Sequence, residues 1–189
     1  GNFTLLDGLK KNQKLDEPVF TPTTKSDEHD RPITPAEIVS EKILSKEMTD
    51  ELERVAKAVF KRGQEIALSK GLILVDTKYE FGLDENGKLT LIAEVHTPDS
   101  SRYWKANTYQ ERIDQGLEPE YFDKEFLRLW FKDNCDPYND AVLPEAPPDM
   151  VAELARRYIE IYETITGEKF EHDFTVPVLD RIEKNLSIK

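Results

Sequence analysis

The sequence predicts an α+β fold, in which helices wrap a small antiparallel sheet. Two segments, residues 48–69 and 149–166, place apolar residues at the i, i+3, i+4 spacing of amphipathic helices. Between them, the apolar run 72–75 and the turn Asp84-Glu85-Asn86-Gly87 are typical of a β-hairpin. The 189 residues contain no internal repeat and are enough for one sizeable core.

The first 34 residues are expected to form an irregular arm. Three prolines interrupt any helix there (Pro18, Pro22 and Pro32), and Pro35 follows at its end. The apolar Val19-Phe20-Thr21 within the arm suits an extended segment packed on another element. So long a structureless segment indicates an arm that binds ligand or docks on a neighbour, and a disordered leader is the alternative. We therefore divide the chain into an arm (1–34), a main lobe (35–168) and a carboxy-terminal tail (169–189).

Helix signals open the main lobe. Thr34 and Glu37 have the spacing of a capping box, which predicts a helix starting near Pro35. The second helix, 48–69, opens with acidic residues that suit the helix dipole, and Gly71 is its stop.

A change of period after the second helix predicts strands. The first strand is expected over 72–81 and to be buried on both faces, and its hairpin partner over 89–95. A polar loop with aromatic residues then reaches about residue 121. Asp123 is expected to cap a helix that carries Phe126 to Phe131, and the tail has room for a short helix.

Composition narrows the class of protein. Lys and Arg number 26 and Asp and Glu 38, so the net charge is −12, which opposes non-specific binding to nucleic acid or to anionic membranes. The single Cys135 excludes an intrachain disulfide and a cysteine-based zinc cluster. No apolar stretch approaches the ~20 residues of a membrane span. We therefore expect a cytoplasmic protein with no nucleic-acid or membrane partner.

Charged residues on the first predicted strand suggest a ligand site. Asp76, Lys78 and Glu80 alternate along it and would share one face. In a cleft, Lys78 would neutralise substrate charge and Glu80 would offer oxygen to a magnesium ion. A solvated row of charges on an edge strand is the alternative.

A second candidate segment follows Pro98. Asp99, Ser100, Ser101 and Arg102 combine hydroxyls, backbone N–H groups and a guanidinium in one turn, which is a good receptor for phosphate or carboxylate. A turn that satisfies only its own backbone is the alternative. The neighbouring His96 is interpreted as a packed histidine rather than a base.

A third candidate is a helix face. Lys124 and Arg128 are four residues apart and would lie on one side of a helix near its N-terminus, where anions are favoured. A solvated charged face is the alternative. A further polar cluster, Thr23-Thr24-Lys25 with His29-Asp30, lies in the arm.

Together these segments closely resemble the SAICAR synthetases, the phosphoribosylaminoimidazole-succinocarboxamide synthases of purine biosynthesis. The matching stretches are long and follow the family's order: 18–25 with His29-Asp30, 71–82, 97–102 and 123–128. The resemblance implies ATP- and Mg²⁺-dependent ligation of L-aspartate to carboxyaminoimidazole ribonucleotide. It also implies a two-lobed fold related to protein kinases and ATP-grasp enzymes, of which this chain is the larger, carboxy-terminal lobe.

The resemblance implies roles for individual residues. Lys78 and Asp99 would be catalytic, and Lys78 and Glu80 would contact ATP, with Glu80 also a metal ligand. The expected substrate-binding residues share polar or charged side chains: Asp30, Ser100, Arg102, Lys124 and Arg128.

Two departures from the family pattern change the expectation for this chain. The family's amino-terminal lobe, with its Gly-Lys nucleotide loop, has no counterpart here, and Ala93 stands where the family has a metal-binding Asp. We therefore expect a truncated form, inactive alone, that forms homo-oligomers or pairs with an amino-terminal lobe. The alternative is a non-catalytic binding or assembly module that keeps the anion pocket but has lost ATP and metal chemistry.

Overall fold

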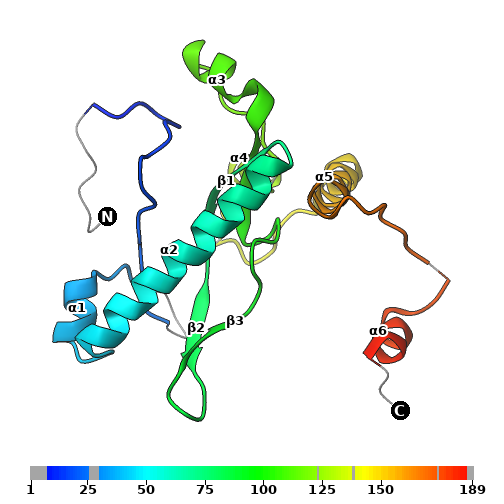
Figure 1. Cartoon of the computed structure of the whole chain (residues 1–189). Helices are drawn as coiled ribbons and strands as arrows, with labels where there is room; N and C mark the ends of the chain where they lie inside the picture. Colours follow the sequence, from blue (N-terminus) through cyan, green and yellow to red (C-terminus); the bar gives the residue numbers. More distant parts are fainter. Residues whose placement is uncertain (1–7, 26–29, 123, 138, 174, 187–189) are drawn as a thin grey trace.

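The computed structural model describes residues 8–25, 30–122, 124–137, 139–173 and 175–186 (Figure 1). Helices and short antiparallel strands alternate along the described chain, which confirms the α+β prediction. In chain order the elements are α1 (Pro35–Ser40), α2 (Lys46–Ser69), β1 (Leu72–Thr77), β2 (Glu80–Leu83), β3 (Leu89–Ile92), β4 (Ser101–Lys105), α3 (Ala106–Asp114), α4 (Glu125–Asn134), α5 (Pro148–Thr166) and α6 (Val178–Leu186).

The first two helices begin and end at the signals that the sequence contains. Thr34 caps α1 in a full capping box, in which its hydroxyl accepts the N–H of Glu37 and the Glu37 carboxylate accepts the N–H of Thr34. Helix α2 starts two residues earlier than expected, because the Ser45 side chain accepts the N–H of Met48. After α2, Gly71 adopts a φ of 75°, a conformation that glycine reaches without strain.

The strands pair differently from the single hairpin that the sequence suggested. The true hairpin is short, with Glu80 opposite Ile92 and Leu83 opposite Leu89. Strand β1 forms its own two-stranded sheet with β4, in which Leu72 lies opposite Lys105. The predicted strand over 72–81 is therefore two strands in two sheets. A pairing between residues about thirty positions apart depends on tertiary packing, which local sequence patterns do not encode.

Strand β4 and helix α3 occupy the stretch that was expected to be a polar loop. Strand β4 is flanked on its second side by residues 120–122, since Lys105 N–H donates to Glu120 O at 2.9 Å and Phe122 N–H to Tyr103 O at 3.1 Å. Burial on this strand follows the period of two, with Ser101 and Tyr103 buried and Arg102 exposed. Ser101 is polar although it is buried, so the sequence of β4 does not show an alternation of apolar and polar side chains.

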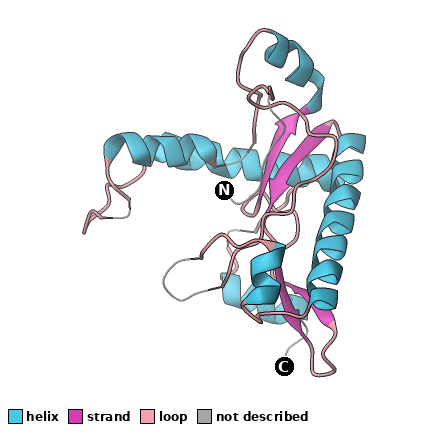
Figure 2. Cartoon of the chain, turned by 90° about the vertical axis from the view of Figure 1, so that its left-hand side faces the viewer, coloured by secondary structure: helices cyan, strands magenta, loops and turns pink. Residues whose placement is uncertain are grey.

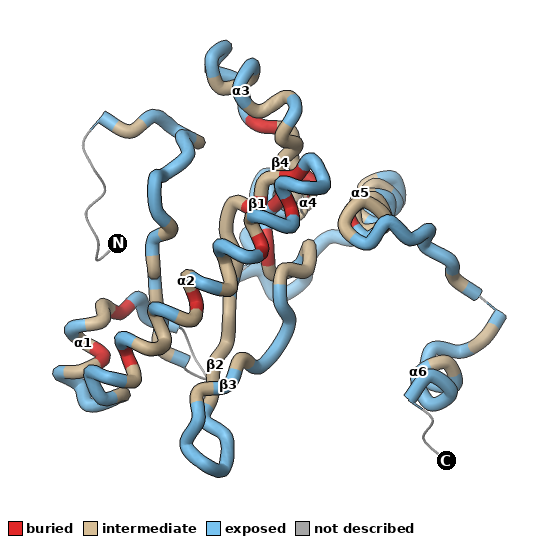
Figure 3. Tube along the Cα trace, viewed as in Figure 1, coloured by how far each residue is buried: buried red, intermediate tan, exposed pale blue. Residues whose placement is uncertain are grey.

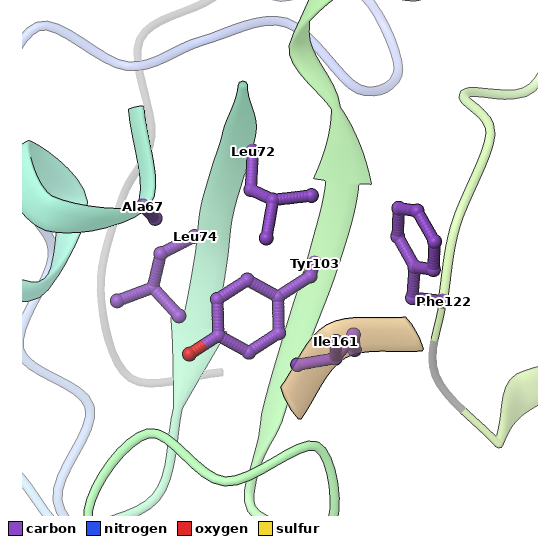
Figure 4. Close-up of a cluster of buried hydrophobic side chains, with 6 residues drawn as sticks. All are labelled: Ala67, Leu72, Leu74, Tyr103, Phe122 and Ile161. Carbon is purple, nitrogen blue, oxygen red and sulfur yellow. The ribbon is translucent and has the colours of Figure 1, made fainter. Parts of the chain in front are cut away.

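The core lies where α2, the β1–β4 sheet and α5 meet. Its buried members are apolar or aromatic: Ala67, Leu72, Leu74, Tyr103, Phe122 and Ile161 (Figure 4). Buried segments are few and scattered elsewhere along the tube of Figure 3, and most of the chain is half-buried or exposed. The packed core therefore supports β1 and β4, the two strands whose ends carry the candidate site residues.

The carboxy-terminal half contains the expected helices with small shifts. Helix α5 runs over Pro148–Thr166 and ends at Gly167, which has a φ of 76°. Helix α4 begins at Glu125 with Lys124 as its N-cap, and the proposed cap Asp123 lies outside the described residues. The tail forms α6, which has no buried residue and lies apart from the main body in Figure 1. Figure 2 shows the strands in magenta at two separate places, one for each sheet. None of the described helices has the length and apolar character to cross a membrane.

Candidate functional site

A pocket of about 300 Å³ gathers most of the residues that the sequence singled out. It is formed by the end of β1, the turn before β4, the start of β4 and the first turn of α4. We call it the Arg102 pocket, and its lining residues are Asp76, Pro98, Asp99, Ser100, Ser101, Arg102, Lys124 and Arg128. Five of the predicted site residues, from two segments over twenty positions apart, therefore share one cavity.

Hydrogen bonds around Thr97 shape the turn that lines this pocket. The N–H of Ser101 donates to Thr97 O at 2.9 Å, and the N–H of Ser100 donates to Thr97 Oγ1 at 3.3 Å. Ser101 is buried, and its hydroxyl lies 2.8 Å from that of Thr77 on β1. The turn thus satisfies part of its own backbone, as the structural alternative proposed, and still presents Ser100 and Arg102 to the pocket.

Ion pairs set the charges in the pocket. Arg102 Nε lies 3.0 Å from both carboxylate oxygens of Asp76, and Lys124 Nζ contacts Asp99. With Arg128, the lining has three cationic and two carboxylate side chains. Such exposed pairs contribute at most about 1 kcal/mol each, so a better-matched anion can displace the carboxylates. The pocket can therefore receive phosphate or carboxylate in a chain whose overall charge is −12.

Helix α4 brings its two cationic residues to the pocket from its N-terminus. Lys124 is the N-cap, and its carbonyl accepts the N–H of Leu127 and of Arg128, each at 3.1 Å. Lys124 therefore precedes the helix instead of lying on its side as predicted. The four-residue spacing still brings both side chains to one cavity, because one helical turn separates them.

The second group of predicted residues forms a charged cluster around Lys78. Lys78 Nζ lies 3.1 Å from Glu80 Oε1, and Lys25 of the arm reaches the same oxygen at 3.2 Å. The hydrogen bond that Lys78 donates to Glu80 is the main cause that raises the pKa of Lys78, and the charges of Asp30 and Glu94 raise it further. The same bond, then that from Lys25, lowers the pKa of Glu80. Both groups are therefore held in their charged forms.

The structure separates Asp76 from the Lys78 cluster. The prediction that Asp76, Lys78 and Glu80 share a strand face is wrong, because β1 ends at Thr77 and β2 begins at Glu80. Asp76 turns to Arg102 instead. The two groups still adjoin, since the N–H of Lys78 donates to Ser100 O at 3.1 Å.

Lys25 and Asp76 are residues of the site that the sequence interpretation left without a role. Lys25 stands in the stretch Thr23-Thr24-Lys25, which matched the family, and only the fold brings it to Glu80. Asp76 was seen as one of a row of charges, and only the β1–β4 register places it opposite Arg102. Contacts between segments far apart in sequence, the arm with β2 and β1 with β4, were the missing signal.

The described side chains do not fit a magnesium ion held by the protein. In the described ranges, no group of three or more His, Cys, Asp and Glu side chains could hold a metal. The Oε1 atom of Glu80, the carboxylate expected to bind the ion, already faces the ammonium groups of Lys25 and Lys78. Two positive charges on one oxygen oppose a divalent cation at that atom.

Ala93, the residue expected to replace a metal-binding Asp, lies beyond the strand on which it was placed. Strand β3 ends at Ile92, so the strand predicted over 89–95 stops before Ala93. Ala93 instead has a φ of 72°, in the left-handed region where Asn and Asp are enriched and alanine is rare.

We predict that Ala93→Asn and Ala93→Asp raise the free energy of unfolding by a few tenths to about 1 kcal/mol, because both residues tolerate the left-handed backbone better than alanine. Ala93→Val should instead lower it, since a β-branched residue is strained there. Urea denaturation of the four proteins measures the effect. Equal stability of the Val and Asn variants would contradict the backbone argument.

Comparison with known proteins gives one consistent family. A family model described as SAICAR synthetase matches residues 2–145. Phosphoribosylaminoimidazole-succinocarboxamide synthase from Legionella pneumophila (strain Lens) is 59% identical over 185 residues, 97% of this chain and 59% of the relative. The chloroplastic enzyme of that name from Arabidopsis thaliana is 56% identical over 184 residues, 97% of this chain and 45% of the relative. This chain thus spans about half to three fifths of these relatives.

Solved structures agree with the sequence comparison. The SAICAR synthase from Saccharomyces cerevisiae complexed with SAICAR superposes with a TM-score of 0.69 at 34% identity, covering 88% of this chain and 52% of that one. A SAICAR synthetase (Type-2) in complex with ADP gives a TM-score of 0.63 at 32% identity, covering 87% and 57%.

Proposed function

The chain belongs to the SAICAR synthetase family, and we propose that it provides the substrate-binding lobe for ATP-dependent ligation of L-aspartate to carboxyaminoimidazole ribonucleotide, which yields SAICAR. The observation that carries this proposal is the Arg102 pocket, in which three cationic side chains and a serine-containing turn converge. Every reactant carries phosphate or carboxylate groups, so a pocket of this chemistry is what the reaction requires.

The chemistry divides into two displacements. The ribonucleotide carboxylate attacks the γ-phosphorus of ATP, which forms an acyl phosphate and releases ADP. The deprotonated aspartate amine then attacks the carbonyl carbon, the amide bond forms and inorganic phosphate leaves. Both steps bring anions together, so their rates depend on side chains that bind and neutralise negative charge.

In this scheme the chain's own residues bind and orient anions. Arg102, Lys124 and Arg128 hold the phosphate and carboxylate groups, and Ser100 donates its hydroxyl to one of them. Asp99, paired with Lys124, positions that ammonium group in the pocket.

The Lys78 cluster serves the nucleotide side of the reaction. Lys78 neutralises charge on the transferred phosphoryl group, with Glu80 holding it in place. The charge of Asp30 acts on Lys78, and we assign Asp30 to the reacting amine. A magnesium ion, when bound with ATP, would neutralise phosphate charge. The paired Glu80 does not favour such an ion at its Oε1 atom.

Calorimetry with SAICAR tests the proposal directly. We expect the 189-residue chain to bind SAICAR with a Kd below about 1 mM, which corresponds to roughly 4 kcal/mol. The phosphate-free nucleoside of the same compound should bind at least about tenfold more weakly, because it lacks one of the charge-assisted contacts. Equal affinities, or no binding of either, would count against the pocket as the substrate site.

ATP should bind to this chain only weakly. The Lys78 side chain is 61% exposed and the Glu80 side chain 34%, so the expected nucleotide residues lie open to solvent. Ligand sites normally enclose most of the ligand surface. Calorimetry with ATP and magnesium chloride should therefore show no binding tighter than about 1 mM. A micromolar Kd would refute this prediction.

A non-catalytic binding module remains the second candidate function, and the unfavourable metal site favours it. Ala93 has no side-chain oxygen, and Glu80 is engaged by two lysines. Such a module would bind SAICAR through the Arg102 pocket and produce none. Mixing the chain with the remaining part of the Legionella relative and assaying SAICAR formation separates the two functions, since only the enzyme lobe restores turnover.

We predict that the chain self-associates. Its accessible surface is 14013 Å² for 21.9 kDa, whereas a compact monomer of that mass exposes roughly 9,300 Å². This excess on one chain is larger than the roughly 1,000–2,500 Å² that each partner contributes to an obligate interface. Val19 of the arm, which was expected to pack on another element, is exposed, and helix α6 adds further exposed apolar residues, Val178, Leu179, Ile182 and Leu186. Light scattering at ~100 µM should detect dimers or larger species; a strict monomer would show the prediction to be wrong.

A further inference from the structure

His96 lies directly before the turn of the Arg102 pocket, and contacts from distant parts of the chain hold it in place. The Tyr79 hydroxyl hydrogen-bonds to His96 Nε2, and the two ring centroids are 5.5 Å apart. Tyr103 Oη donates to the backbone carbonyl of His96 at 2.5 Å. Tyr103 is a buried member of the core. Both the side chain and the backbone of His96 are therefore anchored.

Helix α2 closes the third side of His96. A Cβ atom placed on Gly63 would lie 2.6 Å from His96 Nδ1 and closer still to Cε1. The imidazole thus packs directly on the helix backbone at the one glycine of α2. His96 also has a φ of 56°, a conformation that persists only where surrounding contacts determine it.

Both tyrosines are neighbours in sequence of candidate site residues. Tyr79 stands between Lys78 and Glu80, and Tyr103 follows Arg102. His96 therefore connects the Lys78 cluster to the Arg102 pocket through side chains, and the Lys78 N–H to Ser100 O bond of 3.1 Å is a parallel backbone connection. Displacement of His96 would leave that backbone bond and the Thr77–Ser101 hydroxyl contact to hold the turn against the Lys78 segment.

The protonation states suit this arrangement. Burial lowers the pKa of His96, which favours the neutral imidazole with an acceptor nitrogen. Burial is also the main cause that raises the pKa of Tyr79, which keeps its hydroxyl protonated as the donor. A neutral hydrogen bond at half-buried depth is stable without a counter-charge.

We propose that His96 is a positioning residue of the site. Held by Tyr79, Tyr103 and Gly63, it fixes the turn 97–102 against the Lys78 segment before ligand arrives. The turn therefore loses little conformational entropy on binding, and the binding free energy is not reduced by ordering it. The proposal rests on the proposed function, because it assigns the Arg102 pocket to anionic ligands. It adds a role for His96 that the ion pairs of the pocket do not supply.

The test compares Tyr79→Phe with Tyr109→Phe in the full 189-residue chain. Each variant removes one hydroxyl from a half-buried tyrosine, and Tyr109 Oη donates to Asn12 O at 2.7 Å outside the site. In Tyr79→Phe, amide exchange at Lys78 and Ser101 should quicken at least about tenfold while α2 amides keep their protection. The His96 Nε2 resonance should shift in the same variant.

Ribose 5-phosphate provides the ligand readout by titration. Its Kd should rise about three- to tenfold in Tyr79→Phe and stay unchanged in Tyr109→Phe, at matched melting temperatures. Unchanged exchange at Lys78 and Ser101, or an equal loss in both variants, would overturn the positioning role. Failure of the parent chain to bind ribose 5-phosphate would refute the pocket as a phosphate site, and the exchange measurement would still decide the role of His96.

Discussion

Arg102→Ala should weaken SAICAR binding at least about hundredfold, or roughly 2.7 kcal/mol. The substitution removes a guanidinium that can bind phosphate or carboxylate in two-point contact. It also leaves the Asp76 carboxylate unpaired in the pocket, because both oxygens of Asp76 now face Arg102 Nε at 3.0 Å. The variant loses the attraction between Arg102 and the anionic ligand and gains repulsion from the Asp76 carboxylate. The loss of affinity therefore exceeds that expected for removal of a single charge. Calorimetry with SAICAR measures it.

Two further variants make this test specific. Arg62→Ala removes the same charge from the exposed surface of α2, where Arg62 pairs with Glu65 at 3.0 Å, and should change affinity less than about twofold. Asp76→Asn should strengthen binding, because it frees Arg102 for the ligand. If Arg102→Ala costs no more affinity than Arg62→Ala, the ligand binds elsewhere.

Gly63→Ala should lower the free energy of unfolding by about 1 to 2 kcal/mol, although alanine is the better helix former by about 1 kcal/mol. The added Cβ would meet His96 Nδ1 at 2.6 Å and Leu74 Cδ2 at 2.8 Å. Leu74 is fully buried, so neither neighbour can move without opening the core or breaking the Tyr79 hydrogen bond. Urea denaturation of the variant measures the loss.

The same substitution in a His96→Ala protein identifies the cause of that loss. In His96→Ala the imidazole is absent, and Gly63→Ala added to it should cost much less than in the parent chain, leaving mainly the contact with Leu74. An equal cost in both backgrounds would mean that the clash with His96 is not the source.

The local elements of this fold were predictable from the sequence. The capping box of Thr34 and Glu37 and the stop at Gly71 depend on residues within one helical turn, and the structure shows both. The turn 84–87 likewise formed the expected hairpin between β2 and β3. Side-chain hydrogen bonds and left-handed glycines act on their own neighbourhood, so their patterns survive without knowledge of the rest of the chain.

The chemistry of the candidate site was also predictable as residue types, since hydroxyls and cations within a short stretch indicate an anion receptor in any fold. The neighbours that complete it were not. Lys25 meets Glu80 across more than fifty residues, and Asp76 meets Arg102 because β1 pairs with β4 and not with the strand after the turn. Lys25 and Asp76 therefore gained their partners only in the folded chain.

The sequence by itself thus determined the helices other than α3, the short hairpin and the anion-binding chemistry, because each arises from contacts within a few residues. Tertiary structure alone decided that β4 exists, that Ala93 leaves its strand with a φ of 72°, and that His96 packs on Gly63. These features depend on which distant surfaces pack together. Burial of apolar surface is favourable wherever along the chain that surface comes from. A local sequence pattern therefore does not indicate which distant segments pack together.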